Sequence, residues 1–140
     1  MRNRIVAATV ALCVAVLGAC TQRPQTPLGG TASVTVNGHD AKFQIVKCTQ
    51  MQWYRTIDIG GNFAGATIAV DARGEPVTVE SVRIRNLGGF TGMYSQGGGD
   101  GDADTSLSGG KFTIAGTANG YKVDNPNEPT TATFKIIVNC

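Results

Sequence analysis

The sequence has few residues of the types that are common in active sites, such as histidine, and it has no long apolar run. It has one histidine and one tryptophan in 140 residues. Its longest apolar run, residues 5–17, has thirteen residues, whereas crossing a bilayer core of about 30 Å takes about 20 residues in a helix. No stretch keeps apolar residues at a 3.6-residue spacing. These absences argue against a membrane-spanning helix and against a helical domain.

The beginning of the chain has the three parts of a secretory signal. Arg2 and Arg4 supply a positive start, residues 5–17 supply an apolar centre, and Gly18-Ala19 supplies a small-residue cleavage site. We therefore predict that residues 1–19 are a signal peptide that is removed on export.

A cysteine occupies the first position after the predicted cut. The string Leu17-Gly-Ala-Cys20 resembles the bacterial lipobox, which implies that the Cys20 sulfur receives a diacylglyceryl group and that Cys20 begins the mature protein. An uncleaved apolar anchor, or a cysteine present by chance, is the alternative. Because long acyl chains partition into a bilayer, the membrane is the predicted partner of Cys20.

Removal of the signal changes the charge of the chain. The full sequence has a net charge of +2, with twelve Lys and Arg against ten Asp and Glu. Arg2 and Arg4 leave with the signal, so the mature chain is neutral. It lacks the basic excess that nucleic-acid binding needs. The remaining stretch of about 120 residues is enough for one domain.

The four cysteines divide by the same argument. Cys13 leaves with the signal and Cys20 carries the lipid, so Cys48 and Cys140 remain. Export places both outside the reducing cytosol, and we predict a disulfide between them. A metal or redox pair is the alternative, but neither cysteine has a second ligand at Cys-x-x-Cys or His-x-x-x-His spacing. No metal and no cofactor are predicted.

Residues 20–31 are predicted to be the lipidated cysteine and a short tether. Residues 21–31 contain two prolines, two glycines and a single large apolar residue. An extended tether reaches about 3 Å per residue, which lifts a domain of residues 32–140 just clear of the lipid headgroups.

The remainder, residues 32–140, is dense in β-formers and glycine and predicts an all-β domain. Asn37-Gly38 lies between two alternating runs and predicts a hairpin. In residues 77–87 the apolar parity switches, which predicts a β-bulge near Glu80-Ser81. Other strands are expected at residues 51–59, 66–70, 90–94, 111–117 and 131–140. Seven or eight short strands favour a single antiparallel β-sandwich over a barrel.

The last predicted strand also bears on the bridge. Phe134, Ile136, Val138 and Cys140 share one parity. We therefore expect Cys140 to point towards the core and the bridge to be buried.

Two polar features are weak candidates for chemistry. His39 lies beside the predicted turn, where a solvated histidine is the alternative to a general base. Asp100, Asp102 and Asp104 have the spacing of the first ligands of a calcium loop, but Thr105 and Lys111 replace its required Gly and Glu. A solvated hairpin loop is the alternative.

Two further groups could form binding surfaces. Trp53, Tyr54 and Phe63 could line an apolar ligand groove, although a tryptophan on a strand is more often core. Arg83 and Arg85 alternate with apolar residues and could meet an acidic glycan or protein, or belong to an ordinary solvated strand face.

The sequence resembles the mycobacterial nineteen-kilodalton lipoprotein antigen family over residues 32–140. The strings that carry the resemblance are Val34-Thr-Val-Asn-Gly38, Cys48, Pro76 with Val79-Glu-Ser-Val82, Phe112-Thr-Ile-Ala-Gly-Thr-Ala118, Asn125-Pro-x-x-Pro129 and Phe134-Lys-Ile-Ile-Val-Asn-Cys140. The family carries two matching cysteines. The resemblance implies a cell-envelope lipoprotein with its β domain displayed outward, and recognition of the lipid by host innate immune receptors.

Together these observations predict a non-enzymatic lipoprotein anchored on the extracytoplasmic face of the cell membrane. An interaction or antigen role, with a protein or host receptor as partner, is implied by the resemblance. The alternative is a carrier or binding module for a lipid or another small apolar ligand. A hydrolase would require a site centred on His39.

Overall fold

The computed structural model describes residues 30–98 and 101–140. The predicted signal peptide, Cys20 and most of the predicted tether lie outside the described residues. In the part of the chain that is described, no helix is long and apolar enough to cross a membrane. The strands are β1 (Ala32–Val36), β2 (His39–Phe43), β3 (Val46–Met51), β4 (Tyr54–Gly60), β5 (Gly65–Asp71), β6 (Thr78–Leu87), β7 (Phe90–Ser95), β8 (Ala103–Ser108), β9 (Lys111–Lys122) and β10 (Asn125–Asn139).

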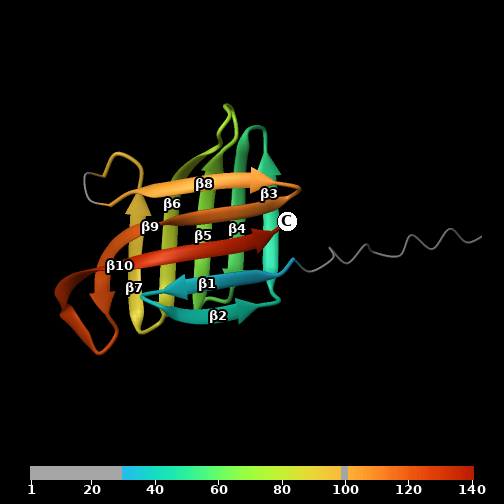
Figure 1. The fold of residues 1–140 in the computed structure, drawn as a ribbon. Helices are drawn as coiled ribbons and strands as arrows, with labels where there is room; N and C mark the ends of the chain where they lie inside the picture. Colours follow the sequence, from blue (N-terminus) through green and yellow to red (C-terminus); the bar gives the residue numbers. More distant parts are fainter. Residues whose placement is uncertain (1–29, 99–100) are drawn as a thin grey trace, which may run out of the picture.

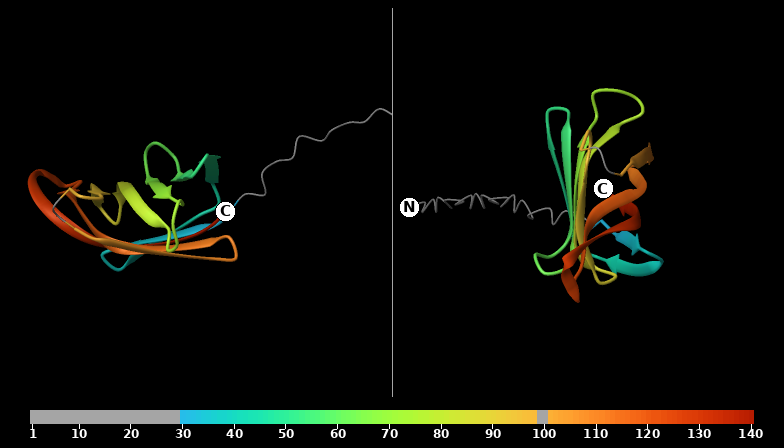
Figure 2. Two further views of the ribbon diagram at one scale, coloured as in Figure 1. Left: turned by 90° about the horizontal axis from the view of Figure 1, so that it is seen from above. Right: turned by 90° about the vertical axis from the view of Figure 1, so that its left-hand side faces the viewer.

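All ten strands belong to one antiparallel sheet, which confirms the all-β prediction. The order is β2-β1-β10-β9-β7-β6-β5-β4-β3, with β8 also paired to β9. Strands β3 to β7 run across the direction of β1, β2 and β8 to β10 (Figure 1). Figure 2 shows the two sets lying face to face. The domain thus has the two layers of a sandwich, but one continuous sheet forms both and nearly closes into a barrel-like shape.

Strand β9 carries the sheet from one layer to the other. Its first half pairs with β8, from Lys111 to Gly116, and its last residues, Asn119 to Lys122, pair with β7. Its other edge pairs with β10 along almost its whole length. A single long strand therefore contributes to both layers.

Two local predictions are confirmed. Asn37 and Gly38 have φ angles of 48° and 80° in the turn between β1 and β2, as a two-residue hairpin turn requires. In the β5–β6 pair, Ala69 lies opposite Ser81 whereas Val70 lies opposite Val79, so Glu80 is the extra residue of a bulge. The bulge explains the switch of apolar parity along β6.

Two other expectations are wrong. The strand expected at residues 51–59 is broken by a turn: Met51 ends β3, Gln52 has a φ of 56°, and Tyr54 begins β4. Strand β8 was not expected, because its sequence, ADTSLS, has one large apolar residue and is mostly exposed. A polar edge strand gives little periodic signal and is recognised only by its pairing with β9.

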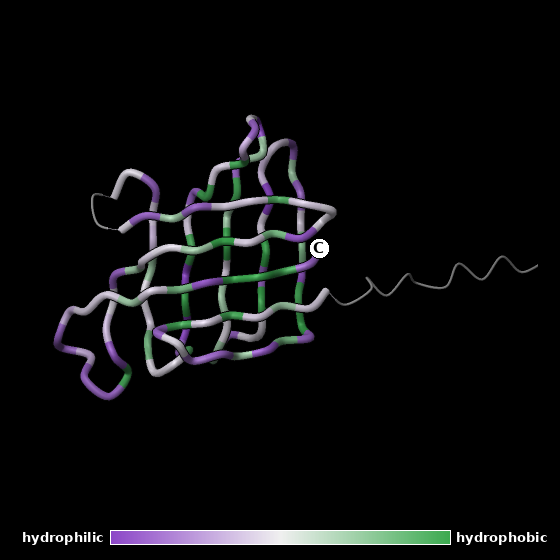
Figure 3. The backbone as a smooth tube through the Cα atoms, viewed as in Figure 1, coloured by the Kyte–Doolittle hydropathy of each residue, from purple (hydrophilic) through white to green (hydrophobic). Residues whose placement is uncertain are grey.

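The core lies between the two layers and is filled by alternate residues of the strands. In β1 every second residue is buried, and Figure 3 shows the apolar stretches running through the middle of the strands. Phe90 and Phe112 are the two largest fully buried side chains. Burial of each large apolar side chain stabilises the fold by about 1.5–3 kcal/mol. The inner faces of the two layers are therefore the main source of stability.

A disulfide joins Cys48 on β3 to Cys140 directly after β10; their Cα atoms are 5.9 Å apart and their sequence separation is 92. It links the edge strand of one layer to the last strand of the other, on the side of the molecule away from β7 (Figure 1). Both cysteines are exposed, so the expectation of a buried bridge is wrong. Cys140 has the parity of the core but lies beyond Asn139, the last paired residue of β10.

Strands β7 and β9 approach closely at a pair of glycines. Gly92 lies opposite Gly120. A Cβ on Gly120 would collide with the Thr91 carbonyl oxygen and the Gly92 Cα, and a Cβ on Gly92 would collide with the Phe90 ring. The absence of side chains at these two positions therefore permits the crossing between layers.

An ion pair between the end of β5 and the β5–β6 loop holds Arg73 against the β3–β4 turn. Asp71 is 7% exposed and accepts hydrogen bonds from the Arg73 side chain, with Nε 2.8 Å from Oδ2, and from the Arg73 backbone N–H at 2.9 Å. The Arg73 guanidinium lies over the Trp53 ring, 5.6 Å from its centre. The hydrogen bonds from Arg73 lower the pKa of Asp71, because they stabilise the ionised carboxylate.

We expect Gly120→Ala to destabilise the domain by about 1–3 kcal/mol, since the added methyl has no space between β7 and β9. Chemical denaturation followed by far-ultraviolet circular dichroism measures the change. Gly74→Ala is the matched control, because a Cβ on Gly74 meets nothing within 4 Å. Equal effects of the two substitutions would contradict this account of the crossing.

Replacement of both Cys48 and Cys140 by Ser should lower the free energy of unfolding by at most about 4–5 kcal/mol, the loop-entropy value for a closed loop of this length. Urea denaturation of the variant and of the oxidised and reduced wild-type protein measures this loss. An unchanged midpoint on reduction would show that the bridge contributes nothing.

Asp71→Asn should remove a pH-dependent part of the stability. Because the folded pKa of Asp71 is lowered, its contribution is complete above the unfolded pKa of about 3.9 and is lost as pH falls through the folded value. The gap in unfolding free energy between wild type and variant should therefore be constant near neutral pH and shrink in acid. Urea denaturation across this range measures the gap. The exposed Asp124, replaced by Asn, is the control, and a gap that widens in acid is the contradicting result.

Candidate functional site

The structure does not bring the three aromatic candidates together. Trp53 and Tyr54 lie in and beside the β3–β4 turn, each 42% exposed, whereas Phe63 is 85% exposed in the β4–β5 turn. Strand β4 separates the two turns. The groove predicted from these residues is absent from the described structure, and Trp53 is not a core residue, because a turn interrupts the strand that would have buried it.

A surface groove of about 580 Å³ contains His39. Its lining residues are Asn37, His39, Asn86, Gly88, Gly89, Phe90, Lys122, Val123 and Asp124. These residues include a base and a carboxylate but no Ser, Thr or Cys. The groove therefore offers no side-chain hydroxyl or thiol for His39 to activate.

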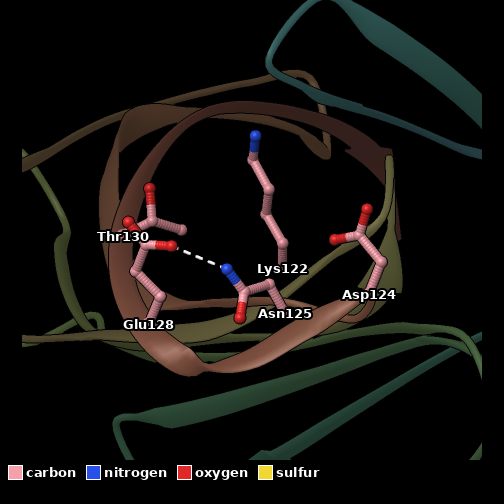
Figure 4. A pocket seen from close by; sticks show the side chains of 5 residues that line it. All are labelled: Lys122, Asp124, Asn125, Glu128 and Thr130. Atoms are coloured by element: carbon pink, nitrogen blue, oxygen red, sulfur yellow. Dashed lines mark hydrogen bonds between the residues drawn. The ribbon is translucent and has the colours of Figure 1, made fainter.

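The β9–β10 hairpin encloses a second, polar hollow of about 260 Å³. Figure 4 shows Lys122, Asp124, Asn125, Glu128 and Thr130 around it. The Asn125 amide donates a hydrogen bond of 2.6 Å to Glu128. Four of the five residues are exposed to solvent. Across residues 30–98 and 101–140, no group of three or more His, Cys, Asp or Glu is placed to hold a metal ion.

The aspartates that resemble the start of a calcium loop lie at and before the beginning of β8. Asp100 lies outside the described residues. Asp102 immediately precedes β8, where its backbone N–H donates to the Thr117 hydroxyl at 3.2 Å and its carboxylate accepts from the same hydroxyl at 3.3 Å. Asp102 thus helps to align β8 with β9.

The two arginines of β6 have different surroundings. Both alternate with buried Val82 and Ile84, as expected. Arg83 is exposed, but the guanidinium of Arg85 donates to the Gly61 carbonyl at 3.2 Å and to the Thr67 hydroxyl at 2.7 Å. Arg85 therefore holds the β4–β5 turn, and Arg83 alone presents its charge to solvent.

Arg55 was not singled out from the sequence. Its guanidinium carbon lies 5.7 Å from the centre of the Phe112 ring, and its Nε is buried without a hydrogen-bond partner among the described residues. It lines a groove of about 230 Å³ with the two bridged cysteines. Arg55 has the parity of Ile57 and Ile59, so an inward position could have been inferred once the turn at Gln52 was known.

A second feature that the sequence did not reveal is an apolar corner near the start of the domain. Ile45, in the turn between β2 and β3, is 72% exposed. Its carbonyl accepts a hydrogen bond of 2.9 Å from Gly60, which begins the turn that carries Phe63. We call Ile45 and Phe63, with these two turns, the tether-side corner.

Comparison with known proteins identifies relatives along the whole chain. The family model for the Mycobacterium 19 kDa lipoprotein antigen matches residues 25–140. A protein of Mycobacterium indicus pranii whose name classes it as a lipoprotein is 63% identical over 140 residues, which cover all of both chains.

Two further relatives carry individual names. The lipoprotein LppE of Mycobacterium tuberculosis is 34% identical over 142 residues, covering all of both chains. The lipoprotein LpqH of the same species is 36% identical over 108 residues, covering 76% of this chain and 67% of that relative. The chain therefore belongs to the Mycobacterium 19 kDa lipoprotein antigen family.

Proposed function

We propose that the protein is a lipid-anchored protein of the cell envelope. Residues 1–19 direct export and are removed, Cys20 carries a diacylglyceryl group, and residues 32–140 form a domain on the extracytoplasmic face of the membrane. The proposal rests on the order of four features at the start of the chain: two arginines, an apolar run, two small residues and then Cys20. Relatives named as lipoproteins match the chain over its full length, the beginning included.

The domain itself is proposed to act by binding and display, without catalysis. The His39 groove has no side-chain nucleophile in its lining, and the hairpin hollow is solvated. Residues 20–140 have equal numbers of basic and acidic side chains, so they lack the overall basic excess that nucleic-acid binding needs. The proposed partners are therefore the membrane, through Cys20, and a protein that meets the exposed surface, a host receptor among them.

The carrier alternative has less support. A lipid carrier needs an apolar cavity that encloses much of its ligand. Here the space between the layers is occupied by side chains such as Phe90, Phe112 and Ile114, all fully buried. The grooves described above open at the surface.

Cys20→Ala should abolish anchoring. The variant lacks the sulfur that accepts the glyceride, so it should move from the detergent phase to the aqueous phase in a detergent phase partition of cells. Cys13→Ala is the matched control, because it removes a cysteine from the same segment and leaves Leu17-Gly-Ala-Cys20 intact. Because an uncleaved run of residues 5–17 could itself enter detergent, the mass of the variant is measured as well. A Cys20→Ala protein that lacks residues 1–19 and still enters the detergent phase would refute the proposed anchor.

Intact-mass measurement of the membrane-extracted protein provides the second readout. The mass should equal that of residues 20–140 plus an acylated glyceride. A mass equal to all 140 residues would show that the signal remains attached.

A further inference from the structure

The tether-side corner exposes two large apolar side chains at the place where the chain enters the domain. Phe63 is 85% exposed and Ile45 is 72% exposed. Exposed side chains of this size are common singly, but here two lie on turns that a hydrogen bond from Gly60 to the Ile45 carbonyl joins. Their position relative to the tether distinguishes them from the other exposed apolar residues.

The tether-side corner lies close to the point where the chain enters the domain. A Cβ on Gly30, the first described residue, would lie 3.3 Å from Val46 Cγ1. Val46 follows Ile45 directly, and the Ile45 carbonyl accepts the Gly60 N–H. In Figure 1 the start of β1 lies beside the lower end of β3. The tether therefore reaches the domain next to Ile45.

The two turns of the corner are held in place by hydrogen bonds. The Gly61 N–H donates to the Ala64 carbonyl at 3.1 Å, which closes the turn that carries Phe63. The Arg85 guanidinium donates to the Gly61 carbonyl from β6. The turns that carry Phe63 and Ile45 are therefore held in place by hydrogen bonds. A bilayer can contact both side chains without a change in the fold.

The charges around the corner suit an anionic surface. Lys42 and Lys47 are exposed on either side of Ile45 in the sequence, and residues 41–57 contain no Asp or Glu. Two acids lie nearby: Asp58 faces Lys47 and accepts a hydrogen bond from Thr67 at 3.0 Å, and Asp40, two residues before Lys42 on β2, accepts one from the Thr35 hydroxyl. Lys42 also lines a groove of about 270 Å³ with Phe43 and Ile137.

We propose that the tether-side corner docks on the bilayer leaflet that holds the acyl chains of Cys20, with Phe63 and Ile45 in the lipid interface and Lys42 and Lys47 at anionic headgroups. This inference rests on the proposed lipid anchor. Cys20 and Gly30 are ten residues apart, so an extended tether keeps them within about 33 Å of each other.

Because the tether is short, weak contacts between the tether-side corner and the bilayer are sufficient for docking. A surface attached to the bilayer meets it as an intramolecular partner, at a high effective concentration. Apolar burial and the attraction of lysine to anionic lipid then act together at the interface. The docked corner fixes which faces of the domain point outward, among them the β9–β10 hairpin.

Tryptophan fluorescence in vesicles tests the docking with the full mature lipoprotein. The chain has a single tryptophan, Trp53. In a Trp53→Phe background, Phe63→Trp places the reporter in the corner. Tyr121→Trp is the matched control, since Tyr121 is a 39% exposed aromatic residue on the hairpin away from the tether. Vesicles contain phosphatidylglycerol and phosphatidylcholine brominated on its acyl chains, and bromine quenches tryptophan at short range.

Docking predicts that bromine lowers the fluorescence of the Phe63→Trp reporter at least about twofold more than that of the Tyr121→Trp reporter. Addition of Ile45→Glu to the Phe63→Trp protein should return quenching to the control level, because a carboxylate is repelled by the interface. If the protein floats with the vesicles but the two reporters are quenched equally, docking is refuted and the lipid anchor is not. Protein that does not float overturns the proposed anchor, and docking with it.

Discussion

The fold depends on the burial of one face of a single sheet against itself. A sheet with one apolar face needs a second layer to cover it, and here the covering layer is the continuation of the same sheet. Strand β9 makes this possible, since it pairs with β8 at one end and β7 at the other. Gly92 and Gly120 allow the close approach at the crossing, and the Cys48–Cys140 disulfide joins the layers on the other side. The buried core, the crossing of β9 between layers and the disulfide all serve to cover the apolar face of the sheet with a second layer.

The strands that end the sheet are polar, which protects the exposed edges. Strands β2 and β3 are the two ends of the pairing order, and β8 is a further edge. Most of their side chains are exposed, with Lys42 and Lys47 among them. Charged and polar residues discourage pairing with another chain. If the protein is anchored at a membrane as proposed above, such edges limit pairing between neighbouring copies.

Among the described residues, five of the nine exposed large apolar side chains lie near the two ends of β4: Met51, Trp53 and Tyr54 at one end, and Ile45 and Phe63 near the other. Trp53 is covered in part by Arg73, which is held by Asp71. Ile45 and Phe63 have no such cover among the described residues and lie beside the chain entry. Apolar side chains are therefore exposed near both ends of β4, beside the Asp71–Arg73 ion pair at one end and beside the point where the chain enters the domain at the other. Only the second of these places lies next to Gly30, the first described residue.

The sequence by itself determined the all-β class, the Asn37-Gly38 hairpin, the bulge at Glu80 and the pairing of Cys48 with Cys140. These features depend on local conformational preference, on side-chain parity, or on a count of the available cysteines. Only the tertiary structure decided that Met51 and Tyr54 belong to different strands, that the polar β8 is a strand, and that the bridge is exposed. It also decided that Phe63 lies at the opposite end of β4 from Trp53, in a turn next to the one that carries Ile45. These outcomes depend on which strands pair and where the sheet crosses between layers, and such long-range contacts leave no periodic pattern in the residues that they bring together.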